Sequence, residues 1–244
     1  MPDPAPLSAA SEHAFALLAE FAAIGVSDVV VAPGSRSQAL ALAAAELERV
    51  GALRLHVRID ERDAGFLALG LALESGRPSL IVTTSGTAVA NLHPAILEAH
   101  HAGVPIIALT ADRPAALRGT RANQTTRQPG IFGPMVRFER DEPAVEAGAV
   151  DVPAVQRLAR HAYAAALGTD DLGNRIASPG AGPVHLNLQY SEPLSTAVRL
   201  ERAPLPRPFA PKPPLGRRSP VPPMPGTIVV AGAGAGPARP EERT

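Results

Sequence analysis

The fold of this chain is constrained most by short apolar runs that alternate with longer segments rich in alanine and leucine. Four such runs are Asp28–Ala32, Leu53–Ile59, Ser79–Thr83 and Pro105–Thr110. Runs that are β-branched and almost without polar interruption are typical of strands covered on both faces. Helical segments between successive strands imply crossover connections and a parallel sheet. The pattern therefore predicts an α/β fold with a mostly parallel sheet of about six strands and helices on both faces.

The helical segments follow the strands at regular intervals. They are expected at residues 8–23, 37–50, 60–74, 86–102 and 152–167. Two further strands are expected at residues 136–138 and 182–188. In the helix at 60–74, apolar surface is expected from Phe66, Leu67, Leu69, Leu71 and Leu73. Residues 111–128 are polar and lack any hydrophobic period, and a loop of that length in a compact domain is commonly functional.

Composition excludes several classes of function. The 244 residues contain 23 Lys plus Arg, 23 Asp plus Glu and no cysteine. A net charge of zero gives no reason to expect nucleic acid or an anionic membrane as a partner. Thiol chemistry and thiolate metal sites are excluded, and no apolar run approaches the ~20 residues that span a bilayer. The first residues do not resemble a secretory signal, so a soluble cytoplasmic protein is expected.

The character of the chain changes after about residue 198. Ten prolines lie between Pro204 and Pro225, which predicts a semi-rigid extended connector. A strand-like run at 227–231 and a Gly-Ala-Gly-Ala-Gly segment at 232–236 follow. This glycine segment does not meet the spacing of a dinucleotide-binding fingerprint. We expect a domain at 1–197, a linker at 198–226 and, at 227–244, the start of a truncated second domain, so that the chain is an N-terminal piece of a longer protein.

Polar residues gather where the predicted strands end. The strand ends are followed by Pro33-Gly34-Ser35-Arg36, by Glu61, by Thr84-Ser85-Gly86, and by Arg113 with Asn123 and Gln124 further along the loop. In a parallel sheet these ends share one edge, where ligands bind. A helix N-terminus favours anions, arginine binds carboxylates through two hydrogen bonds, and glycine allows a backbone to approach a flat ligand.

Simpler explanations compete with each of these features. The turns could be ordinary helix caps, and the loop could be a solvated polar segment. Glu61 is the strongest feature, because a carboxylate at the end of a buried strand is costly unless something binds it. His56 and the His100-His101 pair have no second cluster at ligand spacing, so core or surface histidines are expected and no metal site is predicted in this chain.

Five short motifs occur together in this sequence. They are Ala32-Pro33-Gly34-Ser35-Arg36-Ser37, Arg58-Ile59-Asp60-Glu61-Arg62, Thr84-Ser85-Gly86-Thr87-Ala88-Val89-Ala90-Asn91-Leu92, Ala111-Asp112-Arg113-Pro114 and Ala122-Asn123-Gln124-Thr125. In this order and spacing they resemble the N-terminal pyrimidine-binding domain of a thiamine-diphosphate enzyme family, the 2-succinyl-5-enolpyruvyl-6-hydroxy-3-cyclohexene-1-carboxylate synthases of menaquinone biosynthesis. The resemblance covers about residues 8–200.

The resemblance implies roles for particular residues. The glutamate that matches Glu61 bonds the aminopyrimidine N1′ and promotes proton removal from the thiazolium, a task suited to a buried carboxyl with a raised pKa. Pro33, Thr84 and Gly86 would line the aminopyrimidine. The residues that would bind isochorismate are Ser35, Arg36, Arg113, Asn123 and Gln124. The resemblance attaches no role to residues 127–129.

The resemblance also implies what lies elsewhere. The cosubstrate would be 2-oxoglutarate, which is decarboxylated before its succinyl carbanion adds to isochorismate. Mg²⁺ and the diphosphate would be held by a C-terminal domain whose Gly-Asp-Gly signature is absent here. The complete site would form in a homodimer or homotetramer, so the isolated chain is expected to be inactive. Two alternatives remain open: another thiamine-diphosphate enzyme, of the acetolactate synthase or 2-oxoacid decarboxylase type, and a non-catalytic module.

Overall fold

Six parallel strands form the single sheet of this computed structural model, which describes residues 7–146, 148–176, 179–196, 199–209 and 228. The strand order is β2-β1-β3-β4-β6-β5, and every neighbouring pair is parallel. The strands are β1 (Asp28–Val31), β2 (Arg54–Val57), β3 (Ser79–Thr83), β4 (Ile106–Asp112), β5 (Phe138–Glu142) and β6 (Val184–Gln189). The expected α/β fold with six parallel strands is confirmed.

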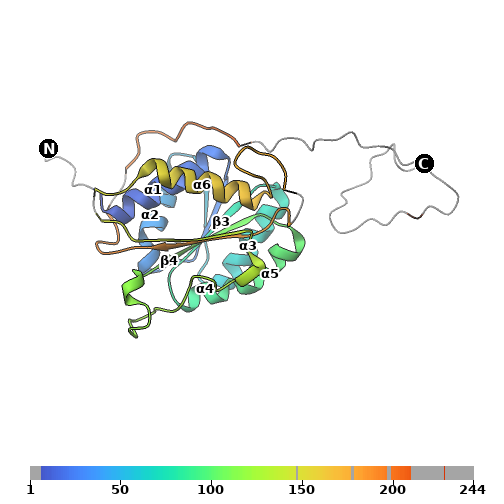
Figure 1. Ribbon diagram of the computed structural model, residues 1–244. Coiled ribbons are helices and arrows are strands. Elements are labelled where there is room, and N and C mark those ends of the chain that lie inside the picture. Colours follow the sequence, from blue (N-terminus) through green and yellow to red (C-terminus); the bar gives the residue numbers. More distant parts are fainter. Residues whose placement is uncertain (1–6, 147, 177–178, 197–198, 210–227, 229–244) are drawn as a thin grey trace. The chain divides into compact units, whose positions relative to one another are not determined.

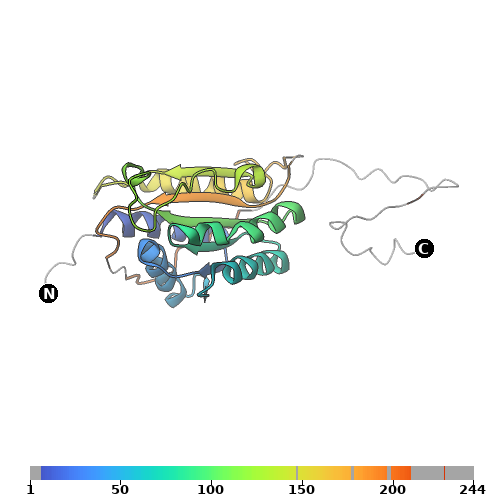
Figure 2. The same cartoon turned by 90° about the horizontal axis from the view of Figure 1, so that it is seen from below.

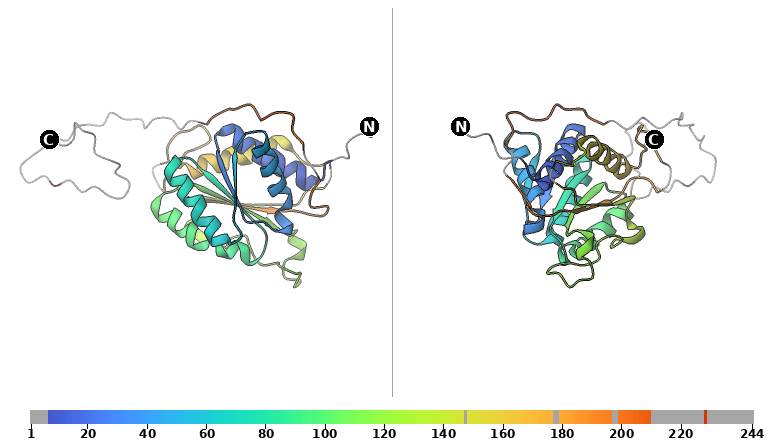
Figure 3. Two further views of the ribbon diagram at one scale, coloured as in Figure 1. Left: turned by 180° about the vertical axis from the view of Figure 1, so that it is seen from behind. Right: turned by 60° about the vertical axis from the view of Figure 1, so that its left-hand side comes forward.

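Helices cover both faces of the sheet. One face carries α1 (Ala9–Ile24), α2 (Gln38–Arg49) and α6 (Val152–Ala166), drawn above the sheet in Figure 1. The other face carries α3 (Glu61–Ser75), α4 (Thr87–Asn91) and α5 (His93–Ala102), which Figure 2 shows from below. Three short helical turns are η1 (Ser35–Ser37), η2 (Ala115–Leu117) and η3 (Gly133–Met135). Each face has its own apolar core. Figure 3 shows the sheet lying between the two layers of helices.

The helix ends follow from local chemistry. Ser8 Oγ accepts the Ser11 N–H at 3.1 Å and begins α1, as the sequence predicts. Asp60 in the same way accepts the Arg62 N–H at 2.8 Å at the start of α3. Gly76 and Gly103 end α3 and α5 at φ values of 64° and 66°, where a side chain would be strained.

Two expected elements differ in their bounds. The single helix expected at 86–102 is divided into two helices, which are separated at Leu92. Pro94 lies in the first turn of α5, where its missing N–H leaves no helical hydrogen bond unmade. The strand expected at 136–138 instead begins at Phe138 and runs to Glu142. This strand is an edge strand with the sequence Phe-Glu-Arg-Asp-Glu, and its polarity hides it from a search for apolar runs.

The edge strand β2 and helix α3 are more open than expected. The four inner strands are buried at every position. The edge strands β2 and β5 are partly exposed, so the expectation that the run Leu53–Ile59 forms a strand covered on both faces is wrong. On α3 the buried side consists of small residues, namely Ala64, Gly65, Ala68 and Ala72. Leu67, Leu69 and Leu71 pack against the second core as expected. Phe66 and Leu73 are 44% and 66% exposed, so the expectation that they supply packed apolar surface is wrong.

The segment after β6 returns over the helices of the first face. The Arg207 N–H donates to Ala23 O at 2.6 Å, and Arg207 pairs with the buried carboxylate of Glu20 at 2.7 Å. The domain bounds proposed from the sequence stay predictions, because most of the linker and nearly all of 227–244 lie outside the described residues. Within the described part, no helix is both long and apolar enough to cross a membrane.

Candidate active site at the carboxyl edge of the sheet

The candidate site lies where the chain changes direction across the sheet. Helix α2 joins β1 to β2 over one face, and α3 joins β2 to β3 over the other. The strands β1 and β3 are neighbours. The chain leaves β1 toward α2 on the first face and leaves β3 toward α4 and α5 on the other face, so the two turns diverge. Such a topological switch point is the usual position of a ligand crevice in an open parallel sheet.

The turns after β1 and β3 touch each other through a glycine. A Cβ atom placed on Gly34 would lie 2.4 Å from Thr84 Cβ, which no packing adjustment of an alanine could relieve. Gly34 has extended backbone angles, so its role is this close approach. The contact brings the turn that contains Pro33 against Thr84, and the family resemblance implies that both residues line the aminopyrimidine.

The Gly86 turn is clamped by the loop that follows β4. Gly86 has φ +83°, and a Cβ there would lie 2.9 Å from Gln124 Cγ. Ser85 Oγ donates to Gln124 O at 2.9 Å, while Gln124 Nε2 donates to Ser85 O at 3.0 Å. Arg113 reinforces the clamp, since its NH1 lies 2.6 Å from Ser85 Oγ and 2.7 Å from Gln124 O.

Arg36 is the more buried of the two candidate carboxylate-binding arginines. Its NH1 donates to Tyr190 O at 2.9 Å and lies 3.5 Å from Glu192 Oε1. Its Nε is buried and has no hydrogen-bond partner among the described residues. Burial, together with the positive charge of Arg113, lowers the pKa of Arg36. Two cations held this close favour an anion between them.

Glu61 occupies the first position of α3, and its surroundings differ from the sequence expectation. Its carboxylate accepts a hydrogen bond from Asn91 Nδ2 at 3.1 Å, in α4 directly after the Gly86 turn. Glu61 is partly exposed, because β2 is an edge strand and Ile59 next to it is 81% exposed. The expected burial of Glu61 is therefore wrong for this chain by itself.

The remaining candidates lie at the same edge with fewer contacts. Pro33 and Ser35 are exposed on the turn after β1, and Asn123 is exposed on the loop after β4. Among the described residues, no hydrogen bond joins the side chain of Ser35 or Asn123 to the other candidates. The structure thus connects Gly86, Arg113 and Gln124 directly, brings Thr84 against Gly34, and leaves Ser35 and Asn123 open to solvent.

A buried polar network under the site was not anticipated from the sequence. Asn187 Nδ2 donates to Asp112 Oδ2 at 3.0 Å and to Asp141 Oδ1 at 2.7 Å, and Arg118 binds both carboxylates at 2.8 Å. Gln128, which received no role, is fully buried and bonded to Gly86 and Asn187. A signal was present: His185, Asn187 and Gln189 alternate along an otherwise apolar strand, which places them on one face.

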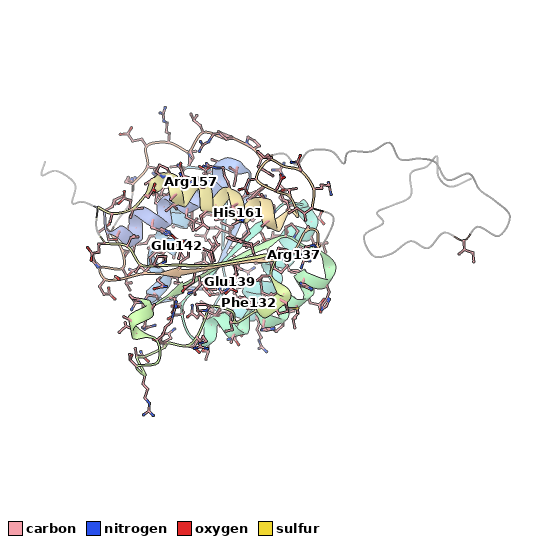
Figure 4. All side chains as sticks on the ribbon, viewed as in Figure 1. Phe132, Arg137, Glu139, Glu142, Arg157 and His161 are labelled. Atoms are coloured by element: carbon pink, nitrogen blue, oxygen red, sulfur yellow. The ribbon has the colours of Figure 1, made fainter. Side chains whose placement is uncertain are left out.

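The charges of this network stabilise one another. Burial alone would raise the pKa of Asp141, but hydrogen bonds from Arg118, Asn187 and Gln189 outweigh it and lower that pKa to about 2. The hydrogen bonds that Arg118 donates to Asp141 in turn raise the pKa of Arg118. The network continues to His185, which lies 3.1 Å from Glu139 and packs edge-on against the Phe132 ring, two residues labelled in Figure 4.

The donor set fits one end of thiamine diphosphate. Glu61 and Asn91, the Gly34–Thr84 contact and the Gly86 turn could face an aminopyrimidine, and the unpartnered Arg36 Nε suits an anionic substrate. Within the described residues, no group of three or more His, Asp or Glu side chains could hold a metal ion. A cavity of about 760 Å³ is lined by Arg118, Gly119, Arg121, Thr125, Thr126, Arg127 and Pro129, and so lies along the loop, without Glu61 or Arg36.

Comparisons with known proteins agree with this geometry. Residues 12–131 match the family model described as thiamine pyrophosphate enzyme, N-terminal TPP binding domain. A 2-succinyl-5-enolpyruvyl-6-hydroxy-3-cyclohexene-1-carboxylate synthase of Leifsonia xyli subsp. xyli is 56% identical over 93% of this chain and 38% of its own length. Proteins of the same name from Clavibacter michiganensis subsp. michiganensis and Nocardioides sp. are 57% and 48% identical over 77% and 79% of this chain, and over 30% of their own length in both cases.

The chain thus spans between 30% and 38% of the length of these curated relatives. The match includes all the turns at the carboxyl edge from Pro33 to Gln124. The chain belongs to the thiamine pyrophosphate enzyme family and corresponds to the N-terminal, thiamine pyrophosphate-binding region of the 2-succinyl-5-enolpyruvyl-6-hydroxy-3-cyclohexene-1-carboxylate synthases.

Proposed function

We propose that this chain forms the pyrimidine-facing half of the active site of a thiamine-diphosphate-dependent synthase. The synthase would decarboxylate 2-oxoglutarate and join the remaining succinyl unit to isochorismate, giving 2-succinyl-5-enolpyruvyl-6-hydroxy-3-cyclohexene-1-carboxylate for menaquinone biosynthesis. The names of the relatives support the reaction. The observation that carries the proposal is the Glu61–Asn91 hydrogen bond, which joins the carboxylate after β2 to the end of α4, the helix that follows the Gly86 turn.

Glu61 would act through a proton on its carboxyl group. Thiamine diphosphate, when bound, supplies a carbon that can take up a 2-oxoacid and stabilise the charge left by decarboxylation. Glu61 would hold a proton against a ring nitrogen of the aminopyrimidine, and the hydrogen bond from Asn91 would orient the carboxylate for this role. Gly86, Thr84 and Pro33 would shape the surface on which the ring lies.

The two arginines would select the second substrate by its charge. Arg36 and Arg113 would bind carboxylate groups of isochorismate, because guanidinium groups match a carboxylate with paired hydrogen bonds. Ser35, Asn123 and Gln124 would contact its hydroxyl and carboxylate oxygens. Glu192 at present lies 3.5 Å from Arg36, so a substrate carboxylate would replace an exposed ion pair that contributes little free energy.

The other half of the site would come from elsewhere. A metal site for Mg²⁺ and the diphosphate is proposed outside this chain, in a further domain. The exposed Phe66 and Leu73 on α3, on the same helix as Glu61, support a covering surface there, and a homodimer or homotetramer would supply it. We therefore propose that the isolated 244-residue chain binds the cofactor weakly and does not turn over, and that the enzyme acts in the cytoplasm.

A substitution of Glu61 tests the proposal. The complete reading frame that contains these residues would be expressed as wild type, Glu61→Gln and Glu74→Gln, and product formation measured with cofactor, Mg²⁺ and both substrates. Glu74 lies in the last turn of the same helix and is exposed, so it is a matched control. We expect Glu61→Gln to lower kcat by roughly 100-fold or more and Glu74→Gln to leave it within about twofold. Wild-type activity in Glu61→Gln would refute the assignment.

Substrate choice separates the remaining alternatives. Turnover of pyruvate in the absence of isochorismate would favour an acetolactate synthase or decarboxylase type of enzyme. Absence of any cofactor binding by the complete protein would favour a non-catalytic module. Product formed by the 244-residue chain alone would contradict the proposed division of the site.

A further inference from the structure

Gln128 is an amide buried in the protein with both ends in use. Its Oε1 accepts the Gly86 N–H at 2.9 Å, and its Nε2 donates to Asn187 Oδ1 at 2.7 Å and to Ala111 O at 3.2 Å. No part of Gln128 is exposed to solvent. A buried amide that satisfies a backbone donor at one end and two acceptors at the other has one acceptable orientation.

The partners of Gln128 fix that orientation independently. Asn187 uses its Nδ2 on the carboxylates of Asp112 and Asp141, so its Oδ1 must face Gln128. The Gly86 nitrogen is a donor only, so it must meet the oxygen of Gln128. The bonds therefore run in one direction from the Gly86 turn through Gln128 to the network in β4, β5 and β6.

The same network anchors both ends of the loop after β4. Arg118, at the start of the loop, binds Asp112 and Asp141 at 2.8 Å, and Gln128, near its end, binds Asn187 at 2.7 Å. The segment between them is largely exposed and reaches back through Gln124, which bonds Ser85 in both directions. The loop is thus held at its two ends and at one point against the Gly86 turn.

We propose that Gln128 is a positioning residue that locks the Gly86 turn and the Gln124 loop into one unit. This inference rests on the proposed function in one respect: the turn faces the cofactor, and the loop faces the second substrate. Gln128 touches neither ligand and acts through Gly86. Its loss would leave the turn and the loop joined only by the bonds among Ser85, Gln124 and Arg113. The two segments would then be less firmly fixed relative to each other, and binding at one would prepare the other less well.

The structure predicts a specific local effect for Gln128→Met. Methionine has a similar volume but offers no strong acceptor, so the buried Gly86 N–H would lose its partner. Gln189→Met is the matched control, because Gln189 has the same side chain and bonds Asp141 in the same network, while its Oε1 accepts the Ala115 N–H at 2.8 Å in place of a bond to Gly86.

Nuclear magnetic resonance on the 244-residue chain reads both sides of the proposed unit. The observables are hydrogen exchange at the Gly86 N–H and the side-chain amide signals of Gln124, each compared with the ladder amides of β3. In Gln128→Met we expect Gly86 exchange to rise roughly tenfold over β3 and the Gln124 signals to move toward those of a free amide. In Gln189→Met both should stay within about twofold of wild type.

Two outcomes would overturn the inference. One is Gly86 exchange in Gln128→Met that rises no more than that of β3, which would mean a general loss of stability. The other is an equal effect of Gln189→Met, which would mean that the whole network, and no single residue, holds the turn.

The complete enzyme provides the functional arm of the test. There, Gln128→Met should raise the Kd of thiamine diphosphate and the KM of isochorismate by roughly tenfold each, with a smaller change in kcat. An unchanged Kd and KM in Gln128→Met, together with faster hydrogen exchange at the Gly86 N–H, would also overturn the inference. An inactive wild-type enzyme would refute the proposed function instead, and the resonance measurements would still decide whether Gln128 positions the turn.

Discussion

The two sides of the carboxyl edge differ in how completely this chain builds them. On the β4–β6 side, Arg113 and Gln128 make several hydrogen bonds each to buried or backbone partners. On the β2–α3 side, the described structure gives Glu61 one side-chain bond, to Asn91, and Val57, Ile59 and Phe66, on the strand, turn and helix that flank it in sequence, are exposed. An active site that excludes water needs cover on the open side as well. One half of the candidate site, the preformed side, is thus built within this chain, and we propose that another surface completes the other half.

Replacement of Arg118, the arginine that binds both carboxylates of the buried network, should have the largest effect on the preformed side. Arg118→Met would leave the fully buried Asp112 and the partly buried Asp141 without their cation. Breaking a buried ion pair by removing one partner costs about 3 kcal/mol or more of unfolding free energy. Urea unfolding of the 244-residue chain at pH 7 measures this loss.

Arg127→Met is the matched control for that measurement. Arg127 is exposed on the same loop, and a surface substitution of this kind changes the unfolding free energy by no more than about 0.5 kcal/mol. Equal losses in the two variants would show that the network under the site is not stabilising and would remove the contrast between the two sides.

Glycine substitutions compare the packing of the two regions directly. Gly34→Ala places a Cβ 2.4 Å from Thr84 and should cost about 2 kcal/mol through overpacking. Gly70→Ala on α3 meets no atom within 4 Å and should stabilise the helix by about 0.5–1 kcal/mol. Thermal and urea unfolding give both values, and a neutral Gly34→Ala would mean that the turns after β1 and β3 do not touch.

The acid stability of the preformed side has a definite sign. The folded pKa of Asp141, about 2, lies below the usual value of 3.8, so this carboxylate stabilises the fold above about pH 4 and loses that contribution as the pH falls toward 2. Since Asp141 is partly exposed, the contribution is about 1 kcal/mol. Asp141→Asn should be less stable at pH 6 and show a shallower loss between pH 4 and 2. A parallel loss in both proteins would contradict this assignment.

Sequence periodicity predicted the preformed half of the fold well. The strands β1, β3 and β4 are nearly continuous apolar runs, and β6 alternates apolar residues with His185, Asn187 and Gln189, so the placement of these four strands and their parallel pairing follow from the sequence. The motif residues Gly34, Thr84, Gly86 and Arg113 then had to meet, because parallel strands deliver their carboxyl ends to one edge. What the pattern could not show was how closely the turns approach, since a tight contact such as Gly34–Thr84 depends on tertiary geometry.

The sequence did not predict the environment of polar residues that are buried or of apolar residues that are exposed. Gln128 and Asn187 are fully buried although their residue types are usually exposed, and only the partners contributed by β4 and β5 make this burial possible. Conversely, Leu73 is apolar and exposed, because small alanines form the buried side of α3. Burial of Glu61 was expected from the apolar run of β2, but a strand at the edge of a sheet has a neighbour on one side only.

The open side should respond least to substitution in the isolated chain. Phe66 and Leu73 lie two turns apart on α3, and the double variant Phe66→Ser/Leu73→Ser should change the unfolding free energy of the 244-residue chain by no more than about 0.5 kcal/mol. Leu71→Ser, which removes a side chain packed against the second core, should cost about 1 kcal/mol and serves as the control.

The same double variant should have a larger effect once the open side is covered. If another surface covers α3 in the complete enzyme, two serines there would expose polar groups at an apolar contact and weaken assembly. Sedimentation of the complete enzyme over a range of concentrations measures this, and the cofactor Kd should rise with the loss of assembly. A double variant that assembles like the wild type would mean that the exposed face of α3 stays in water, and that whatever surface closes over Glu61 does so without using Phe66 or Leu73.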